Sequence, residues 1–361
     1  MTASSMAARD RLLAILDLAR WAPSGDNTQP WRFEIVSDDH IAIHGYDTRD
    51  HVLYDFDGHP SHMAHGALLE TLRIAATQYG LAAEWSRREG TPDTSPIYDI
   101  TLHANVGLAP DPLIPFIRAR TVQRRPMKTV PLSDEQRDTL RTAVGPDYEV
   151  CFCESLAERY ELAKVLWDNA YIRLTCPELY AVHRDVIEWD SRFSKDRIPD
   201  QAVGVDRLTA KLMRWVMQDW RRVTFFNRYL FGTIIPRLQL DFFPALFCAA
   251  HLLVKAKTVP VTLEDFVKAG VAMQRLWLAA SSIGLYVQPE MTPVIFRWYS
   301  HCGRRFSASP DAHSMSMALA AKFEHCLHAG PHDAFVFFCR VGRSTAPRSR
   351  SVRREVQELM K

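Results

Sequence analysis

Two stretches decide the fold: HGALLETLRIAATQYGL at residues 65–81 and AGVAMQRLWLAASSIGL at residues 269–285. They align at a single offset of 204 residues, which brings Gly66 onto Gly270 and also aligns the closing Gly-Leu pairs. Each stretch predicts a nearly all-apolar helix that ends at a glycine cap. Glycine inside a helix costs about 1 kcal/mol relative to alanine, so both glycines predict close approach by another helix or a ligand. The alternative is that two buried helices share alanine and leucine by chance.

A weaker echo follows each predicted helix. Residues 98–107 and 335–342 both predict a strand that closes on Val-Gly, at an offset of 235 residues. The longer offset predicts an insertion between helix and strand in the second copy. Prolines near residue 110 mark a linker, so we divide the chain into a first unit, residues 1–110, and a second unit, residues 111–361.

The composition is that of an ordinary globular protein, with 361 residues, 47% hydrophobic, 24% charged and a formal net charge of +2. Aromatic residues at 11% exclude a disordered chain, and the near-neutral charge argues against nucleic acid as a partner. The longest nearly apolar run, residues 242–254, has 13 residues, whereas crossing a bilayer takes about 20. Residues 1–10 lack the apolar stretch of a leader peptide. We expect a soluble, cytoplasmic protein with no membrane partner.

Cysteine and histidine patterns predict structural roles. Seven cysteines, an odd number in a long chain, predict free thiols rather than a disulfide framework. His59, His62 and His65 fit one helical face only loosely and lack a further ligand, so we predict a polar helix start and no metal. His251, inside the apolar run, is predicted to be a hydrogen-bonded core histidine rather than a catalytic base.

The sequence lacks G-x-G-x-x-G, a Walker loop, H-E-x-x-H and G-x-S-x-G. This argues against a dinucleotide-binding Rossmann fold, a P-loop enzyme and an α/β-hydrolase. With only 15 glycines, the chain has few glycine-rich phosphate cradles. Any bound phosphate would have to be held largely by side-chain cations.

The two units differ where each opens. The first has an apolar helical pattern from Leu12 to Ala19, then APSGDNTQPW at residues 22–31, then a predicted strand at residues 32–36. The second has a predicted helix at residues 133–143 and a strand at 148–152, joined by only four residues. The long loop of the first unit is therefore absent from the second.

The loop at residues 22–31 resembles the A-P-S-x-x-N-x-Q-P-W loop of FMN-dependent nitroreductase-like flavoproteins. Arg120-Thr-Val-Gln-Arg124 resembles that family's opening R-x-S-x-R/K segment, and Pro347-Arg-Ser-Arg350 its closing P-K-S-R segment. The two Gly-Leu-ended helices resemble its central dimer helices. The resemblance implies an α+β, nitroreductase-like fold of two interlocked halves. Each half would have an antiparallel-rich sheet flanked by helices.

The resemblance also implies FMN as cofactor. The implied FMN-binding residues are Pro23, Ser24, Gly25, Asn27, Arg120, Arg124, Arg348 and Arg350. Met291 or Thr292 would supply a backbone N–H near flavin N5. Independently, a phosphate dianion without a glycine cradle needs several guanidinium groups. The alternative for the arginine-rich final segment is a solvated basic tail.

In this family each flavin lies between two subunits, which contribute different segments. Here the second unit has the arginine segments and the first unit has the loop, so only one of two pseudo-equivalent sites has all its parts. We therefore predict a monomeric, single-chain pseudo-dimer with one FMN. The implied activity is hydride transfer between a reductant, NAD(P)H, and a small planar organic substrate. The alternatives are a flavin-binding or flavin-sequestering protein without turnover and a structural protein without flavin.

Two features depart from the family pattern. Val122 stands where a hydroxyl residue is usual, and Arg353 or Arg354 would compensate at the phosphate. The second unit also carries an aromatic-rich insertion at about residues 177–254. By position this insertion would form a helical lid over the ring face. The alternative is that its aromatic residues pack an enlarged core.

Overall fold

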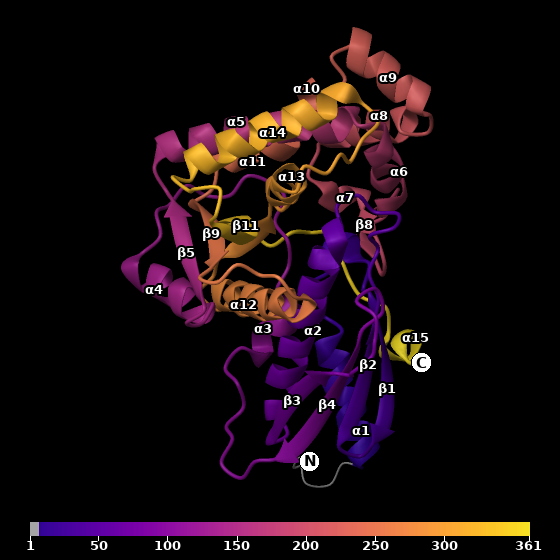
Figure 1. Ribbon diagram of the computed structural model, residues 1–361, viewed down its shortest axis with the longest axis vertical. Helices are drawn as coiled ribbons and strands as arrows, with labels where there is room; N and C mark the ends of the chain where they lie inside the picture. Colours follow the sequence, from indigo (N-terminus) through magenta and orange to yellow (C-terminus); the bar gives the residue numbers. More distant parts are fainter. Residues whose placement is uncertain (1–6) are drawn as a thin grey trace.

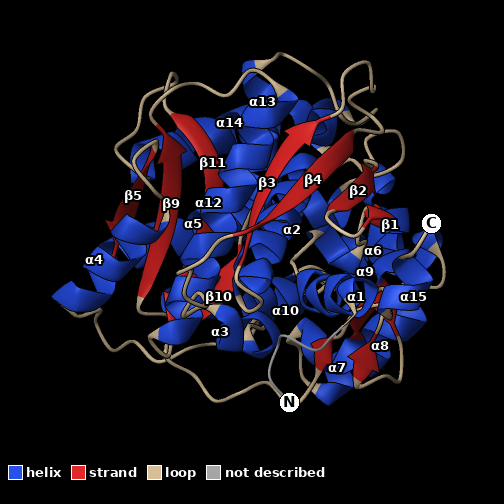
Figure 2. Cartoon of the chain, turned by 90° about the horizontal axis from the view of Figure 1, so that it is seen from below, coloured by secondary structure: helices blue, strands red, loops and turns tan. Residues whose placement is uncertain are grey.

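The computed structural model describes residues 7–361 as an α+β protein with two antiparallel four-stranded sheets. Residues 1–6, part of the first unit and of the segment searched for a leader peptide, lie outside the described residues. In Figure 2, β5 and β9 of one sheet lie far from β1 and β2 of the other. Each sheet belongs to one of the two units.

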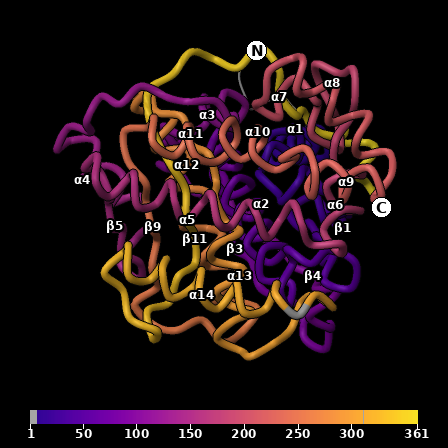
Figure 3. Tube along the Cα trace, turned by 90° about the horizontal axis from the view of Figure 1, so that it is seen from above, coloured from indigo at the N-terminus to yellow at the C-terminus, as the bar shows by residue number. Residues whose placement is uncertain are grey.

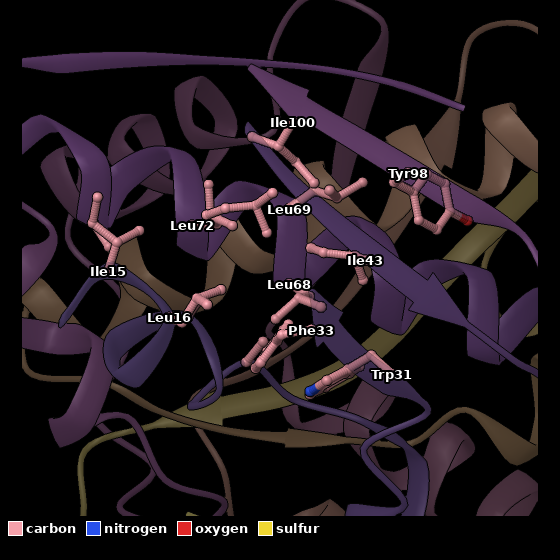
Figure 4. Packing of buried hydrophobic residues seen from close by; sticks show 14 of the residues in the cluster. Ile15, Leu16, Trp31, Phe33, Ile43, Leu68, Leu69, Leu72, Tyr98 and Ile100 are labelled. Carbon is pink, nitrogen blue, oxygen red and sulfur yellow. The ribbon is translucent and has the colours of Figure 1, made fainter. Parts of the chain in front are cut away.

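The first unit forms the smaller half. Its elements are α1 (Ala8–Ala19), η2 (Gly25–Asn27), β1 (Trp31–Ser37), β2 (His40–Gly45), η3 (Phe56–Gly58), α2 (His59–Thr77), β3 (Leu81–Arg87) and β4 (Ile97–Ala104). The strand order is β1-β2-β4-β3. Alternate residues of β1 and β4 point inward, among them Trp31, Phe33, Tyr98 and Ile100, and pack against α1 and α2 (Figure 4). The helix and strand expected around the loop are confirmed.

The second unit repeats this plan. Its corresponding elements are α3 (Ile114–Ala119), α4 (Asp134–Ala143), β5 (Tyr148–Cys153), β9 (Ala250–Ala256), α12 (Leu263–Ser282), β10 (Tyr286–Pro289) and β11 (Ala334–Gly342). The strand order β5-β9-β11-β10 matches that of the first sheet position by position. Only a short turn joins α4 to β5, as predicted. The two units thus share one topology, helix–strand–strand–helix–strand–strand.

Two insertions enlarge the second unit. Between β10 and β11 lie α13 (Thr292–His301) and α14 (Pro310–Cys326), where the offset of the echoes predicted extra residues. Between β5 and β9 lie α5 (Leu156–Thr175), α6 (Pro177–Val186), β6 (Ile187–Glu188), β7 (Phe193–Ser194), β8 (Ile198–Pro199), α7 (Asp200–Val203), α8 (Arg207–Val216), α9 (Trp220–Tyr229), α10 (Ile234–Arg237), a π-helix η4 (Leu238–Phe242) and α11 (Phe243–Leu246).

The predicted bounds of the second insertion, residues 177–254, were wrong at both ends. The segment that leaves the sheet begins before α5, and β9 is a central strand of the sheet. The physical reason is that β9 is buried on both faces, so it shows a continuous apolar run without strand alternation.

α2 and α12 cross at the centre of the molecule (Figure 1), and the two matched glycines lie at the crossing. A Cβ on Gly66 would lie 1.9 Å from the carbonyl oxygen of Val267 on α12. Reciprocally, a Cβ on Gly270 would lie 2.0 Å from the carbonyl oxygen of Met63 on α2. The prediction of a close helix approach is confirmed, and glycine is required at both positions.

Segments distant in sequence pair with one edge strand of each sheet. Val122 forms a parallel bridge with Val287 at the edge of the second sheet. After β12 (Arg350–Ser351) and α15 (Val356–Leu359), Met360 bridges Phe33 of β1, so the yellow end of the chain lies beside the indigo strands in Figure 1. Figure 3 shows from above that this end lies next to β1. Each sheet edge is therefore extended by a distant segment.

The cysteines and His251 have the structural roles that the sequence predicts. All seven cysteines are free thiols, as predicted. His251 is fully buried with both ring nitrogens hydrogen-bonded, which confirms a satisfied core histidine. Over residues 7–361, no helix is both long enough and apolar enough for a transmembrane span. The same part of the chain contains no group of three or more His, Cys, Asp or Glu side chains placed to hold a metal.

Candidate functional site

A cavity of about 510 Å³ lies where segments of both units meet. Its lining includes the predicted site residues Pro23, Ser24, Gly25, Asn27, Arg120, Arg124, Met291, Thr292 and Arg350. Arg348, the remaining predicted residue, is exposed and outside the lining, and its carbonyl oxygen accepts a hydrogen bond from Arg192. The volume is typical of a pocket for a small molecule or cofactor.

The loop at residues 22–31 forms one wall of the cavity in a strained conformation. Asp26, Asn27 and Gln29 all have positive φ, at 49°, 65° and 50°, and non-glycine residues rarely adopt this region. The amide of Gln29 donates to Ser24 Oγ at 2.9 Å, which closes the loop on itself. Asn27 Nδ2 donates to the carbonyl oxygen of Val352 at 3.2 Å. Strain of this kind is maintained at functional sites by the surrounding structure.

Gln29 explains how the loop is held in place. Its side chain is fully buried, and its Nε2 donates to the carbonyl oxygens of Asn27 and Lys195, both at 2.9 Å. Its Oε1 accepts from the amide of Arg354 at 3.0 Å. The loop of the first unit is thus fixed by segments of the second.

Three arginines, Arg120, Arg350 and Arg353, form a cationic end of the cavity, which we call the arginine cluster. Among the described residues none of the three has a carboxylate within 4.0 Å. Carbonyl oxygens position them instead: Arg120 Nη2 donates to that of Trp21 at 2.8 Å, and Arg353 Nε to that of Ala22 at 3.0 Å.

The arginines of the cluster also contact aromatic rings, and their positive charges repel one another. The Arg120 guanidinium lies 4.4 Å from the ring centroid of Trp277, and that of Arg350 lies 4.9 Å from the ring of Trp21. Burial, and then repulsion from the neighbouring arginines, lower the pKa of Arg120 and lower that of Arg353 to about 9. Uncompensated buried cations are costly, so this end of the cavity suits an anionic ligand.

A second set of charged side chains, Asp26, Arg124 and Arg340, lines the cavity beside the loop. Burial raises the pKa of Asp26, although Arg124 and Arg173 oppose this rise. Burial also lowers the pKa of Arg124 to about 10, against the favourable charge of Asp26. The side chain of Arg340 donates to the carbonyl oxygen of Arg124 at 2.8 Å, which ties this group to β11.

Arg340 also forms a buried ion pair with Glu290. Arg340 Nη1 donates to Glu290 Oε1 at 2.5 Å, and Glu290 Oε2 lies 2.9 Å from His251 Nδ1. Burial favours the neutral imidazole, but interactions with Cys248 and with the Glu290 carboxylate outweigh burial and raise the pKa of His251 to about 10. Glu290 is the residue before Met291, so this network fixes the backbone at the start of α13.

The insertion, together with Tyr54 of the first unit, lines the part of the cavity away from the arginine cluster. Tyr54 Oη and His183 Nε2 share a hydrogen bond of 2.8 Å, and burial lowers the pKa of His183 to about 3, which favours the neutral imidazole. Arg173 Nη2 donates to Asp241 Oδ1 at 2.5 Å, and Asp241 lies on the π-helix η4. Burial, despite the opposing charge of Arg173, raises the pKa of Asp241 to about 6.

Helices α8 and α9 form the roof of the cavity. Met213, Met217, Trp220 and Val223 line it with apolar surface. The position of the insertion predicted a lid, and these residues of the insertion do face the cavity. Among its other aromatic residues, Phe225 and Tyr229 are exposed, whereas Phe242 packs against a buried apolar cluster.

Unpartnered polar atoms cluster around the cavity. Several of its lining residues have a buried nitrogen or oxygen without a hydrogen-bond partner: Asn27 Oδ1, Arg120 Nε, Asn169 Oδ1, Arg173 Nε, Gln288 Oε1 and Arg340 Nε. Buried polar groups are normally paired. Their concentration here is what a site for a polar ligand requires.

Sequence reasoning missed the residues away from the arginine cluster. No motif links Tyr54 to His183 or Arg173 to Asp241, because each pair spans more than 60 residues and joins different helices or loops. Gln29 stood within the recognised loop motif, so its role as the anchor of the loop had a sequence signal. Arg353 was expected only as a compensating cation, and it belongs to the arginine cluster.

Part of this chain is similar to a known protein family. The family model described as the Nitroreductase family matches residues 4–64, a segment that includes the strained loop. The uncharacterized protein MT1398 of Mycobacterium tuberculosis (strain CDC 1551 / Oshkosh) is 26% identical over 288 residues. That alignment covers 76% of this chain and 37% of the relative, so this chain spans well under half the length of that protein.

Two solved structures are also similar. A nitroreductase with bound FMN from Desulfitobacterium hafniense DCB-2 is 14% identical, with 66% of this chain and 92% of that chain covered and a TM-score of 0.38. The FMN-dependent nitroreductase NfnB from Mycobacterium smegmatis, in complex with NADPH, is 13% identical, with 68% and 95% covered and a TM-score of 0.37. The strained loop thus lies within the segment of this chain that is similar to the Nitroreductase family.

Proposed function

We propose that the cavity binds one FMN and that the chain is an FMN-dependent oxidoreductase. One observation carries this proposal: segments separated by more than 300 residues, from Pro23 to Arg353, meet at one cavity whose cationic end has no carboxylate partner. The match of the loop segment to the Nitroreductase family supports the same conclusion.

The residues present fit the parts of this cofactor. The arginine cluster would hold the phosphate, since guanidinium groups bind phosphate oxygens in pairs. The loop residues Pro23, Ser24, Gly25 and Asn27 would contact the cofactor from the first unit. The unpartnered polar atoms around the cavity are available for a ligand with many hydrogen-bonding groups.

Arg124 and the start of α13 would act on the electronics of the ring. Arg124 lies in the lining without a salt-bridge partner among the described residues, and a cation favours negative charge nearby. The amides of Met291 and Thr292 open α13, and the first amides of a helix lack acceptors within it. We propose that one of these two amides donates to the ring.

Bound FMN would supply two-electron hydride transfer. The protein would exclude water with the apolar roof formed by Met213, Met217, Trp220 and Val223. The space beneath this roof suits a small planar organic substrate, with NAD(P)H as the reductant. The polar groups of Tyr54 and Arg173 would orient that substrate from the insertion side.

The sharing of parts supports a single-chain pseudo-dimer, in which residues 1–110 and 111–361 take the place of two subunits. The loop comes from the first unit and the arginines from the second, and α4 joins β5 without such a loop. We therefore propose one FMN per monomeric chain. Flavin-to-protein absorbance after reconstitution and desalting should give a ratio of one, and a ratio of two would contradict the proposal. Arg120→Met/Arg353→Met is the control variant and should retain little flavin.

A second candidate function is flavin binding without turnover, which the roof over the cavity favours. Stopped-flow mixing of the FMN-loaded protein with NADH or NADPH distinguishes the two functions. Fast bleaching of the flavin absorbance supports the reductase. Absence of bleaching by either nucleotide, with flavin still bound, supports a binding or sequestering protein.

A further inference from the structure

The roof helices α8 and α9 form a hairpin, residues 206–231, that projects at one corner of the molecule in Figures 1 and 3. Neither helix has a fully buried residue. The hairpin instead exposes large apolar side chains: Leu208, Leu212, Trp215, Phe225, Tyr229, Leu230 and Phe231. Leu208 and Phe231 are each 77% exposed. Exposed apolar side chains concentrated in this way mark an interaction surface.

These side chains form a continuous surface. On α8, Leu208, Leu212 and Trp215 follow the i, i+4, i+7 spacing of a single helical face. Trp215 contacts α9 through Phe226, with ring centroids 5.8 Å apart. On α9, Phe225 lies 5.3 Å from Tyr229 between ring centroids. The outer side of the hairpin is thus lined with aromatic and aliphatic groups.

The same hairpin is strongly basic. It contains six cations, Arg207, Lys211, Arg214, Arg221, Arg222 and Arg228, against two carboxylates, Asp206 and Asp219. Both carboxylates accept backbone hydrogen bonds as N-caps of α8 and α9. Six cations and two carboxylates give the hairpin a formal charge of +4, whereas the whole chain has a net charge of only +2. Of the six cations, Arg214 is paired with Asp190 outside the hairpin.

Cations and aromatic rings are interleaved on this surface. The Arg222 guanidinium lies 4.6 Å from the ring centroid of Trp215, and that of Arg228 lies 5.4 Å from the ring of Tyr229. The apolar core of a protein–protein interface is depleted of charge. A lipid surface instead takes apolar side chains into the acyl boundary while adjacent cations contact anionic headgroups. The interleaving therefore favours a lipid surface over a protein partner.

We propose that this hairpin binds the surface of an anionic membrane. Trp215, Phe225 and Phe231 enter the interface, and the flanking arginines contact the lipid phosphates. Each helix has ten residues, so the hairpin lies on the bilayer and does not cross it. The prediction of no membrane partner rested on the absence of a segment long enough to span a bilayer. A hairpin that lies on the membrane surface does not need such a segment.

The inner side of the same hairpin roofs the cavity through Met213, Met217, Trp220 and Val223. Membrane binding therefore places the roof of the cavity at the lipid surface. The proposal does not depend on FMN, because every residue that carries it lies on the outer side of the hairpin.

The test is flotation of the full-length protein with vesicles. Vesicles of phosphatidylcholine with about 30% phosphatidylglycerol should carry the protein upward, and vesicles of phosphatidylcholine alone should carry at least tenfold less, since each surface cation contributes to binding. Raising the salt from about 0.1 M to about 0.5 M should release the protein, because the Debye length shortens. The flavin-free protein should bind equally well, so loss of the proposed function would leave this result unchanged.

Two variants assign the binding to the hairpin. Trp215→Ser/Phe225→Ser and Arg221→Glu/Arg228→Glu should each lower vesicle binding at least tenfold, with unchanged thermal unfolding because these side chains are exposed. The matched control, Leu156→Ser/Val261→Ser, removes apolar side chains that are 65% and 82% exposed elsewhere and should bind like the wild type. Absence of binding to anionic vesicles, or equal binding by the hairpin variants, would overturn the proposal. Light scattering that showed a dimer abolished by Trp215→Ser/Phe225→Ser, without vesicle binding, would assign the surface to a second copy instead.

Discussion

The two units have the same strand order but very different connections between the strands. In the first unit, β1 and β2 are joined by a two-residue turn at residues 38–39. In the second, the equivalent strands β5 and β9 are separated by residues 154–249, which contain helices α5 to α11. The sheet and its central helix are retained in both, so the topology depends on the buried strands and on the glycine crossing. The connections are free to change.

Most of the cavity is lined by these variable connections between strands. Most helices of the second unit that line the cavity, α5, α6, α7, α8, α9 and α13, lie in an insertion, and the central helix α12 contributes Met273 and Trp277. The first unit supplies the strained loop and α2. One unit therefore keeps the compact fold, while the other contributes most of the side chains that line the cavity.

The largest effect is expected at the crossing of α2 and α12. Gly66→Ala and Gly270→Ala each place a methyl group about 2 Å from a carbonyl oxygen of the partner helix, and neither backbone can move without separating the units. We expect each variant to lose about 3 kcal/mol or more of unfolding free energy in urea titrations followed by circular dichroism.

Gly330→Ala is the matched control for the helix crossing. Its nearest neighbour would be Asp333 Oδ2 at 3.9 Å, an ordinary contact. A change within about 0.5 kcal/mol is expected there. If Gly66→Ala unfolded at the same urea concentration as Gly330→Ala, the two units would not be held together at these glycines.

The next effect distinguishes the two arginines of the closing motif. Arg350 lines the cavity and Arg348 does not. If Arg350 binds phosphate, Arg350→Met should lose a charge-assisted hydrogen bond of about 1.5–3 kcal/mol, which raises the FMN Kd roughly 10- to 150-fold. Arg348→Met should leave the Kd within about twofold. Titration of flavin fluorescence measures both, and equal effects would contradict the placement of the arginine cluster.

A third prediction concerns the pH dependence of the first unit. The start of α2 carries buried histidines, and burial, followed by repulsion from His65 and Arg49, lowers the pKa of His62 to about 2. Because the unfolded chain binds this proton at a higher pH than the folded chain, His62 destabilises the fold as pH falls below about 6.5, by about 1.4 kcal/mol per pH unit. The stability it contributes is fully present above pH 6.5.

His62→Gln removes this titration and keeps a hydrogen-bond acceptor for Arg49. Between about pH 6.5 and 5, its unfolding free energy should fall less steeply than that of the wild type, by about 1.4 kcal/mol per pH unit. His103→Gln, at an exposed position of β4, should keep the wild-type slope. Identical slopes for His62→Gln and the wild type would show that His62 is protonated in the folded protein.

The smallest effect compares the opening helices of the two units. Ser133 caps α4 and forms a reciprocal capping box with Gln136, whereas α1 follows Ala7 and has no side-chain cap. Ser133→Ala should cost about 1 kcal/mol, and Ala7→Ser should gain about 0.5–1 kcal/mol. Urea midpoints measure both. A loss of stability on Ala7→Ser would mean that the start of α1 does not have free amides to cap.

Much of the fold could be predicted from local sequence patterns. The Gly-Leu-ended helices, the loop at residues 22–31 and the strand at residues 335–342 carry short-range signals that matched the structure. The arginines were predicted from the resemblance of two short segments to family motifs, and the preference of phosphate for guanidinium groups supports that prediction. The strand β9 was missed because a strand buried on both faces has no alternating pattern to distinguish it from other apolar segments.

The polar groups away from the arginine cluster could not be predicted. The position of Asp241 depends on a π-helix, and that of His183 on how α6 folds back towards Tyr54. Both follow from tertiary packing of the insertion, and neither leaves a periodic signal in the sequence. For the same reason Arg348 and Arg350, two residues apart, could not be told apart before their surroundings were known.

The bridge between Met360 and Phe33 has a consequence for the order of folding. The edge of the first sheet is completed by residues that leave the ribosome more than 300 residues after the strand they join, so the sheet formed during synthesis has an open edge. Contacts this distant in sequence slow folding, because a large loop must close before the contact stabilises the chain. The first unit would therefore remain open to wrong strand pairing until the rest of the chain has been made. A chaperone that shields β1 during synthesis would act on the one edge that the protein closes last.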